Sequence, residues 1–374
     1  MFTTIDSDVI KQGDATDAYF LRTEEALDEA GRNPEVVAEV SADQFSDGNF
    51  EVFAGLDDVT ELLEGLPIDV DSLDEGRYFD GGPVMRLTGN YRDFARYETA
   101  LLGFLSHASG MATEADAAVQ KVTEPDVSLL SFGSRHVHPA IGGMLERSAF
   151  IAGFDGYSYV AAEGVIPGTP SGTMPHALIL SFGKSNQAEA FTAFNDGVDE
   201  DVPRIALCDT FSDEIEEVRM AVETLGDDLD GVRVDTTSSR RGNFRDIIRE
   251  INWLLDELGR SDVDVYISGG IRPENIEELQ DIVDGFGIGS HVSNAEPVDF
   301  GLDIVEIEGE PISKRGKLSG VKNVVREGGE HKVTLDERDD DLLKPLIRDG
   351  DVVREWDVVD ARETVADERD YFNL

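Results

Sequence analysis

Two glycine-rich turns in this sequence are suited to holding a phosphate. They are "ISGGI" (267–271) and "GFGIGS" (285–290), and each ends a short apolar stretch. Closely spaced glycines let backbone N–H groups approach an oxyanion, and the N-terminus of a following helix adds partial positive charge. Either turn alone could simply require a positive φ. Two of them in succession favour a phosphate cradle.

Charged residues follow other apolar stretches. Arg135 in "SFGSRH" and Arg233 in "GVRVDTT" can bind phosphate or carboxylate in bidentate fashion. Arg233 lies two residues before Asp235, so both side chains point to the same face of an extended strand, and an internal ion pair explains Arg233 as well as ligand binding does. Asp209 and Asp235 could orient a sugar hydroxyl or a Mg²⁺-bound pyrophosphate, or they could cap the next helix.

An aromatic residue and a histidine complete the candidate chemistry. Phe132 could present its ring to a flat heterocycle, although an aromatic at a strand end also fits the core. His176 in "PSGTMPHALILSFG" stands between a polar turn and an apolar run, and it could be a titrating group at the end of a barrel strand or a structural histidine. Taken alone, it fits the structural role better. The six histidines show no metal-ligand spacing, and the single Cys208 excludes a disulfide framework and a Cys-based zinc site.

The charge of the chain limits its partners. There are 79 Asp and Glu against 32 Lys and Arg, which gives a formal net charge of -47. At molar salt the Debye length falls to about 3 Å, so self-repulsion would be screened, and we expect a cytoplasmic protein of a halophile. Nucleic acid and anionic membranes are excluded as partners because both need a basic surface. A hydrophobic content of 40% excludes an acidic disordered protein, and no apolar run is long enough to span a bilayer.

The hydrophobic patterns predict three segments. Residues 1–124 read as an N-terminal α/β domain with strands in "VVAEVSA", "NFEVFAG" and "VMRLTG", followed by a long helix or helix pair from Tyr91 to about Ala118. Residues 125–292 alternate short apolar strands with helices. Residues 293–374 return to strand-like and loop material that we expect to pack back on the N-terminal domain.

The middle segment predicts a parallel sheet. Its expected strands are "SLLSFG", "YSYVAAE", "ALILSFG", "RIALCDT", "GVRVDTT", "VDVYISGG" and "GFGIGS". Strands that alternate with helices at intervals of about 30 residues indicate βα units, and this many in succession favour a barrel. The polar stretches "SFGSRH", "CDTFSD", "VDTTSSR", "SGGIRP" and "GIGSH" would then meet at one mouth.

Several blocks of the sequence occur in the order of a known family. They are "KQGDATDAYFLRT", "YETALLGFLSHASGMAT", "SFGSRHVHP", "GFDGYSYV", "SGTMPHAL", "ALCDTFSDE", "GVRVDTTS" and "KRGKLSG". Over about residues 10–325 the chain resembles the nicotinate phosphoribosyltransferases, most closely the shorter archaeal members. The resemblance implies a type II phosphoribosyltransferase fold, with an irregular α/β barrel beside an open-faced α/β sandwich domain. It also implies at least a homodimer with shared active sites.

The same resemblance implies a reaction and a set of contacts. Phosphoribose would pass from phosphoribosyl pyrophosphate to nicotinate in NAD biosynthesis, with Mg²⁺ as cofactor and ATP as co-substrate. Phe132 and, from the neighbouring subunit, Tyr19 would stack on the pyridine ring, and a neutral Ser158 would favour nicotinate over nicotinamide. The remaining implied roles are phosphate contact by Arg135, carboxylate or anion contact by Arg233, ribose binding by Asp235, and a phosphate cradle of Gly269, Gly270, Gly289 and Ser290.

His176 takes a sharper role from this resemblance. "SGTMPHA" matches the site where relatives carry a histidine that ATP phosphorylates, and a neutral imidazole is a competent nucleophile near pH 7. Tyr159 departs from the family pattern, which often has asparagine there, and the chain lacks the C-terminal cysteine cluster of some archaeal relatives. Two alternatives stay open: a quinolinate phosphoribosyltransferase, which would need a denser basic pocket, and a catalytically silent barrel subunit.

Overall fold

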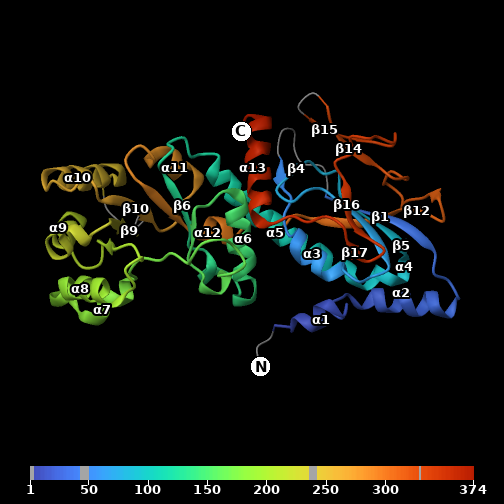
Figure 1. The fold of residues 1–374 in the computed structure, drawn as a ribbon, viewed down its shortest axis with the longest axis horizontal. Coiled ribbons are helices and arrows are strands. Elements are labelled where there is room, and N and C mark those ends of the chain that lie inside the picture. Colours follow the sequence, from blue (N-terminus) through green and yellow to red (C-terminus); the bar gives the residue numbers. More distant parts are fainter. Residues whose placement is uncertain (1–3, 43–49, 236–241, 328–329) are drawn as a thin grey trace. The chain divides into compact units, whose positions relative to one another are not determined.

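The computed structural model describes residues 4–42, 50–235, 242–327 and 330–374. It divides the chain into two compact units (Figure 1). Unit 1 comprises Met1–Thr113, Ile151–Gly153 and Ala295–Leu374, and unit 2 comprises Glu114–Phe150 and Phe154–Asn294. Of the polar stretches expected at the strand ends, the part of "VDTTSSR" after Asp235 lies outside the described residues. No helix in the described ranges is long and apolar enough to cross a bilayer.

Unit 1 is built on a seven-stranded antiparallel sheet in the order β13-β12-β1-β5-β3-β16-β17. The N-terminal part of the chain supplies β1 (Glu35–Ala42), β3 (Ile68–Ser72) and β5 (Pro83–Asn90). The C-terminal part supplies β12 (Phe300–Ile307), β13 (Glu310–Pro311), β16 (Lys344–Arg348) and β17 (Asp351–Val352). Because β12 pairs with β1 and β16 with β3, the two ends of the chain share one sheet.

The helices of this part of unit 1 are α1 (Ser7–Lys11), α2 (Ala18–Glu29), α3 (Leu56–Leu63), α4 (Tyr91–Phe94), the 3₁₀ turn η1 (Ala95–Tyr97) and α5 (Glu98–Val119). Buried residues of α3, α4 and α5 belong to the same core as the sheet, whereas α2 contacts η1. The stretch from Tyr91 is thus a short helix and a long one. Alternate residues of β3 are buried, as expected for a strand with one face on the core, and Phe53, Met85 and Leu105 are fully buried in the same cluster.

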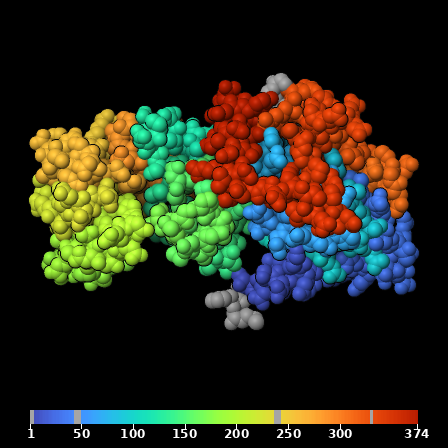
Figure 2. Space-filling model, viewed as in Figure 1, coloured from blue at the N-terminus to red at the C-terminus, as the bar shows by residue number. Residues whose placement is uncertain are grey.

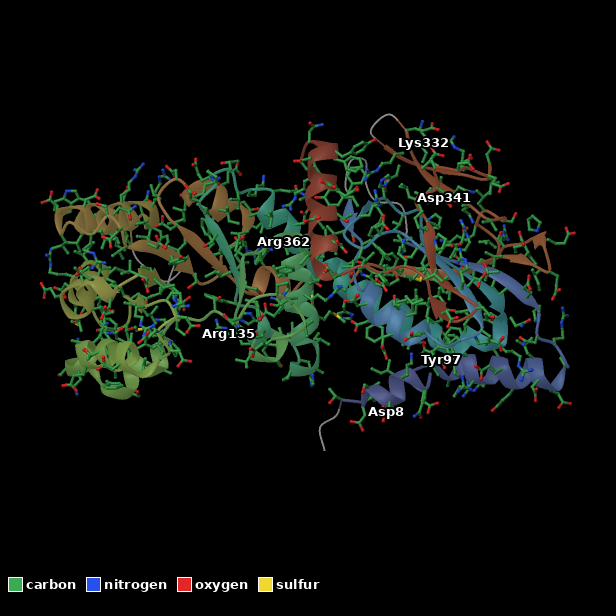
Figure 3. All side chains as sticks on the ribbon, in the orientation of Figure 1. Asp8, Tyr97, Arg135, Lys332, Asp341 and Arg362 are labelled. Carbon is green, nitrogen blue, oxygen red and sulfur yellow. The ribbon has the colours of Figure 1, made fainter. Side chains whose placement is uncertain are left out.

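Short strand pairs and one long helix complete unit 1. β2 (Glu51–Val52) pairs with β4 (Tyr78–Phe79), and β14 (Asn323–Glu327) pairs with β15 (Glu330–Thr334). The expectation of strand and loop material near the C-terminus was wrong for α13 (Val358–Phe372), whose N-terminal Asp357 and Asp360 form a capping box. Arg362 of α13, which is labelled in Figure 3, donates to the carbonyl of Gly153. Figure 2 shows the C-terminal segment, in red, spread over unit 1.

Unit 2 carries a six-stranded parallel sheet in the order β7-β6-β11-β10-β9-β8. Its strands are β6 (Ser128–Ser131), β7 (Gly156–Tyr157), β8 (Ile205–Leu207), β9 (Gly231–Val234), β10 (Asp264–Ser268) and β11 (Gly285–Ile288). The last strand, β11, pairs with the first, β6, as barrel closure requires. Within the described residues the ring of hydrogen bonds is interrupted between β7 and β8, so the sheet forms an incomplete, irregular barrel.

That interruption falls where a strand was expected. "ALILSFG" does not form a strand, because His176–Phe182 is the helix α7, which follows Pro175 at its N-cap. A short, mostly apolar run such as this one satisfies helical and strand patterns equally well, and here Ile179 is buried while Leu180 is 56% exposed. The barrel therefore lacks one strand between β7 and β8, and α7 begins in that interval.

The other helices of unit 2 follow its strands, except for one that follows α7. They are α6 (Gly142–Ala152), α8 (Gln187–Gly197), α9 (Glu214–Leu225), α10 (Phe244–Glu257), α11 (Pro273–Leu279) and α12 (Ser290–Ser293), with 3₁₀ turns η2 (Ser134–His136), η3 (Pro139–Ile141) and η4 (Val160–Ala162). In α10 the residues Ile248, Ile251 and Leu255 face the core, whereas Trp253 is exposed.

Candidate active site

A cavity of about 520 Å³ lies at the carboxyl ends of the unit 2 strands. All but two of the residues expected to bind substrate line it: Phe132, Arg135, Ser158, His176, Arg233, Asp235, Gly269, Gly270, Gly289 and Ser290. The two exceptions are Asp209 and Tyr19. Carboxyl ends of parallel strands meet at one edge of a sheet, and this explains why residues far apart in the sequence converge there.

The ring of Phe132 occupies space that a glycine leaves open. Phe132 follows β6, and its backbone N–H donates to the carbonyl of Ile288 on β11 at 2.8 Å. A Cβ at Gly287 would lie 2.5 Å from two ring carbons, so only glycine admits the ring in this position. The guanidinium carbon of Arg233 lies 5.6 Å from the ring centroid. Phe132 is thus half-buried at the cavity wall beside a cation.

The glycines after β10 have the conformation that a backbone cradle needs. Gly269 and Gly270 have φ values of 90° and 75°, which other residues rarely adopt. A Cβ at Gly269 would lie 2.4 Å from the carbonyl oxygen of Asp235, so the turn also requires a close approach of two backbones. After β11, Gly289 and Ser290 line the same cavity.

Two aspartates and a histidine form one hydrogen-bonded group. His176 Nε2 lies 2.9 Å from Asp209 Oδ1, and its Nδ1 lies 3.8 Å from Asp235 Oδ2. The other oxygen of Asp209 accepts the backbone N–H of Asp235 at 2.8 Å, and Ser268 donates its hydroxyl to Asp235 Oδ1. The Asp209 side chain is only 1% exposed, whereas that of His176 is 34% exposed. Asp209 therefore supports the cavity from behind, and Asp235 and His176 face it.

The arginines differ in their surroundings. Arg233 donates to the carbonyl of Met174 at 3.2 Å, and burial lowers its pKa, although Asp235 and Asp209 act in the opposite direction. Its Nε is buried without a hydrogen-bond partner in the described part of the chain. Arg135 is exposed, is labelled in Figure 3, and donates from Nε to His136 Nε2 at 3.2 Å. Burial and the charge of Arg135 lower the pKa of His136.

The segment after β7 forms another part of the wall. Ser158 lines the cavity, and the next residue, Tyr159, donates its hydroxyl to the carbonyl of Pro139 at 2.9 Å. Its ring packs on Gly142, where a Cβ would come within 2.5 Å of it. The departure of Tyr159 from the family pattern is thus accommodated by the glycine that starts α6.

Tyr19 belongs to unit 1. It lies on α2, its ring is 55% exposed, and its hydroxyl donates to Asp17 at 3.2 Å. Burial and the carboxylate of Asp17 raise its pKa.

Sequence reasoning missed the buried glutamates that support the loops. Glu217 on α9 is fully buried, and its carboxylate accepts the backbone N–H groups of Thr210, Phe211 and Ser212 at 2.6–2.8 Å. Glu146 on α6 is also fully buried, behind the loop that carries Phe132. One signal in the sequence was available for both Glu146 and Glu217. Each is an acidic residue on the apolar face of a helix, and each of these helices follows a polar stretch at a strand end.

The fit to Mg²⁺ rests on a single carboxylate. No group of three or more His, Cys, Asp or Glu side chains in the described ranges could hold a metal ion. Asp235 nevertheless lines the cavity, and Mg²⁺ in phosphate-transfer sites commonly uses one or two carboxylates with oxygens of the substrate's phosphates. The residues present therefore fit a metal that arrives with a pyrophosphate, and they do not fit a cage made by protein alone.

The fold and the cavity define a class of protein: a βα enzyme with a backbone cradle, two arginines and an aromatic ring at the strand ends. Residues 17–109 match the family model of the quinolinate phosphoribosyl transferase N-terminal domain, and residues 111–303 match that of the C-terminal domain. The chain belongs to this family, within the type II phosphoribosyltransferases.

Individual relatives agree with this membership. The chain is similar to nicotinate-nucleotide pyrophosphorylase from Pyrococcus furiosus, whose crystal structure matches 100% of this chain and 99% of that one at 44% identity, with a TM-score of 0.92. Human nicotinic acid phosphoribosyltransferase shares the fold over 95% of this chain and 94% of that one, with a TM-score of 0.75 at 19% identity. Nicotinate phosphoribosyltransferase pncB1 of Mycobacterium tuberculosis (strain H37Rv) is 27% identical over 324 residues, which cover 80% of this chain and 70% of that protein.

Proposed function

We propose that this chain is a nicotinate phosphoribosyltransferase, which joins nicotinate to phosphoribosyl pyrophosphate and releases nicotinate mononucleotide and pyrophosphate. The observation that carries the proposal is the position of Phe132 beside Arg233 in a cavity that the Gly269 turn and Asp235 also line. A flat ring, its carboxylate and a sugar phosphate each find a matching group there. The names of the relatives point to the same nucleotide.

The reaction is a displacement at the anomeric carbon. The ring nitrogen forms a bond to this carbon as the bond to pyrophosphate breaks and its electron pair leaves with the pyrophosphate. Positive charge develops on the sugar, where Asp235 would stabilise it, and Arg135 would neutralise the departing anion. The glycine turns after β10 and β11 would hold the 5'-phosphate, and Ser158 would face the ring without repelling its carboxylate. Mg²⁺ held by Asp235 and the pyrophosphate would supply further charge neutralisation.

ATP coupling through His176 is part of the proposal. Nε2 of His176 donates a hydrogen bond to the carboxylate of Asp209. In a neutral imidazole the lone pair then lies on Nδ1. The lone pair would attack the γ-phosphorus, forming an N–P bond as ADP leaves, and water would later cleave that bond. A neighbouring subunit would supply Tyr19 to the second face of the ring, for which its exposed position on α2 is suitable.

Quinolinate is the second candidate substrate, because both family models that match the chain are those of quinolinate phosphoribosyl transferase. Purified protein in molar KCl should be assayed with Mg²⁺ and phosphoribosyl pyrophosphate, with each acid separately, and with or without ATP. We expect pyrophosphate release with nicotinate. Turnover of quinolinate alone would reassign the substrate, and release with neither acid would favour the silent barrel subunit.

A further inference from the structure

Glu146 is a fully buried carboxyl group behind the ring-binding part of the cavity. It is 0% exposed, and neither of its oxygens has a hydrogen-bond partner within the described ranges. Four groups nevertheless lie near enough to lower its pKa: the hydroxyls of Ser131 at the end of β6 and of Ser134 in η2, and the backbone N–H groups of Ser158 and Tyr159 after β7. Ser134 and Ser158 line the cavity, so Glu146 lies directly behind its wall.

Glu217 shows how a buried glutamate behind such a loop can be satisfied. It accepts three backbone N–H groups and the side-chain amide of Gln187 at 2.8 Å or less. Among the described residues, by contrast, no donor comes within hydrogen-bonding geometry of either carboxylate oxygen of Glu146. Its negative charge is therefore poorly stabilised, and burial raises its pKa to about 7 although the four nearby groups lower it.

The groups that lower the pKa of Glu146 are neutral hydrogen-bond donors. Tyr157 on β7 is also neutral, and the charge of Glu146 contributes to raising the pKa of that phenol. Arg147 follows Glu146 on α6 and is itself buried, whereas Arg135 in η2 is exposed. Glu146 thus remains a group that can change its charge behind the ring site.

We propose that Glu146 takes up a proton from solvent when a ring that bears a carboxylate binds between the loops that follow β6 and β7. This inference rests on the proposed function. A bound carboxylate and an ionised Glu146 would be two anions separated by little water, where salt screens weakly, so they would repel each other. A neutral ring such as nicotinamide carries no charge and would be indifferent to Glu146. The residue thus makes the binding of the acid, and only of the acid, dependent on pH.

Equilibrium dialysis of radiolabelled nicotinate and nicotinamide in 2 M KCl tests this with Glu146→Gln, which keeps the size and removes the charge. Between pH 6.0 and 8.5 the Kd of wild type for nicotinate should rise about 30-fold relative to the variant, as expected for one linked proton with a pKa near 7. The ratio for nicotinamide should stay constant. Glu75→Gln, at a buried glutamate of unit 1 that already accepts the N–H groups of Gly55 and Leu56, is the matched control and should behave as wild type.

Calorimetry on the wild-type protein keeps the test independent of variant folding. Titrations at pH 8 in two buffers with different ionisation enthalpies should report uptake of close to one proton per nicotinate. No proton uptake, or the same pH dependence in Glu146→Gln and wild type, would overturn the inference while leaving the proposed function intact. Failure of wild type to bind nicotinate at every pH would overturn both.

Discussion

His176 Nε2 and Asp209 Oδ1 are 2.9 Å apart, and the second oxygen of Asp209 holds the backbone N–H of Asp235. One buried carboxylate thus orients the imidazole and the strand end that face the cavity. Asp209 adds its charge to both contacts without lining the cavity itself. We therefore expect Asp209 to position its neighbours, a role that a short motif in the sequence does not distinguish from direct binding of substrate or metal.

Asp209→Asn tests that role. The amide keeps the shape and can still accept from the N–H of Asp235, but it removes the negative charge that favours a hydrogen bond from Nε2 of His176. We expect ATP-stimulated kcat to fall by about 10²–10⁴-fold, because the residue that orients the catalytic histidine loses its charge. In a His176→Ala background the same change should cost little more. Equal and additive losses in the two backgrounds would show that Asp209 acts independently of His176.

Gly287→Ala tests the ring site. A Cβ there would lie 2.5 Å from the ring of Phe132, so the ring must move out of its position. We expect the KM for nicotinate to rise by at least about tenfold, while the KM for phosphoribosyl pyrophosphate changes little. Gly143→Ala on α6 is the control, because a Cβ at Gly143 meets no atom within 4 Å. Unchanged nicotinate kinetics in Gly287→Ala would remove Phe132 from the ring site.

Much of the cavity could be predicted from the sequence because its residues follow short apolar strands. Phe132 after β6, Asp235 after β9 and Gly269 after β10 each stand next to a recognisable strand, and a parallel sheet brings such positions to one edge. The rule needs no knowledge of the contacts between the loops.

The errors have equally specific causes. The run 177–183 fits a strand or a helix, and its hydrophobicity alone could not show that α7 interrupts the barrel. α13 was missed although Asp357 and Asp360 mark its start, because "DVVREWDVV" just before it has the composition of a strand. Whether Glu146 is hydrogen bonded depends on loops that are distant in sequence, and no local pattern records it.

His331 should make stability depend on pH. It lies on β15 near the rings of Phe50 and Phe372, and burial and the charges of Arg326 and Arg77 lower its pKa from 6.5 to about 4. The folded state therefore favours the neutral ring, so this stability is complete above pH 6.5 and is lost as the pH falls towards 4. Relative to His331→Gln, wild type should lose about 3 kcal/mol of unfolding free energy across that interval. Urea titrations at pH 7.5 and 4.5 would measure it, and equal losses in both proteins would contradict the assignment.

Salt should stabilise the whole chain. With a net charge of -47, repulsion among carboxylates opposes the compact state, and salt shortens the range of that repulsion to about 3 Å at 1 M. We expect Tm to rise by at least about 10 °C between 0.1 and 2 M KCl in calorimetric scans. Glu39 is buried, forms an ion pair with Lys322 at 2.7 Å and lies 3.7 Å from Arg86. Salt screens these buried charges much less, so Glu39→Gln should lower Tm at both salt concentrations. NaCl should act like KCl, because screening depends on ionic strength. A Tm that does not change with salt would show that surface repulsion does not limit the stability of this chain.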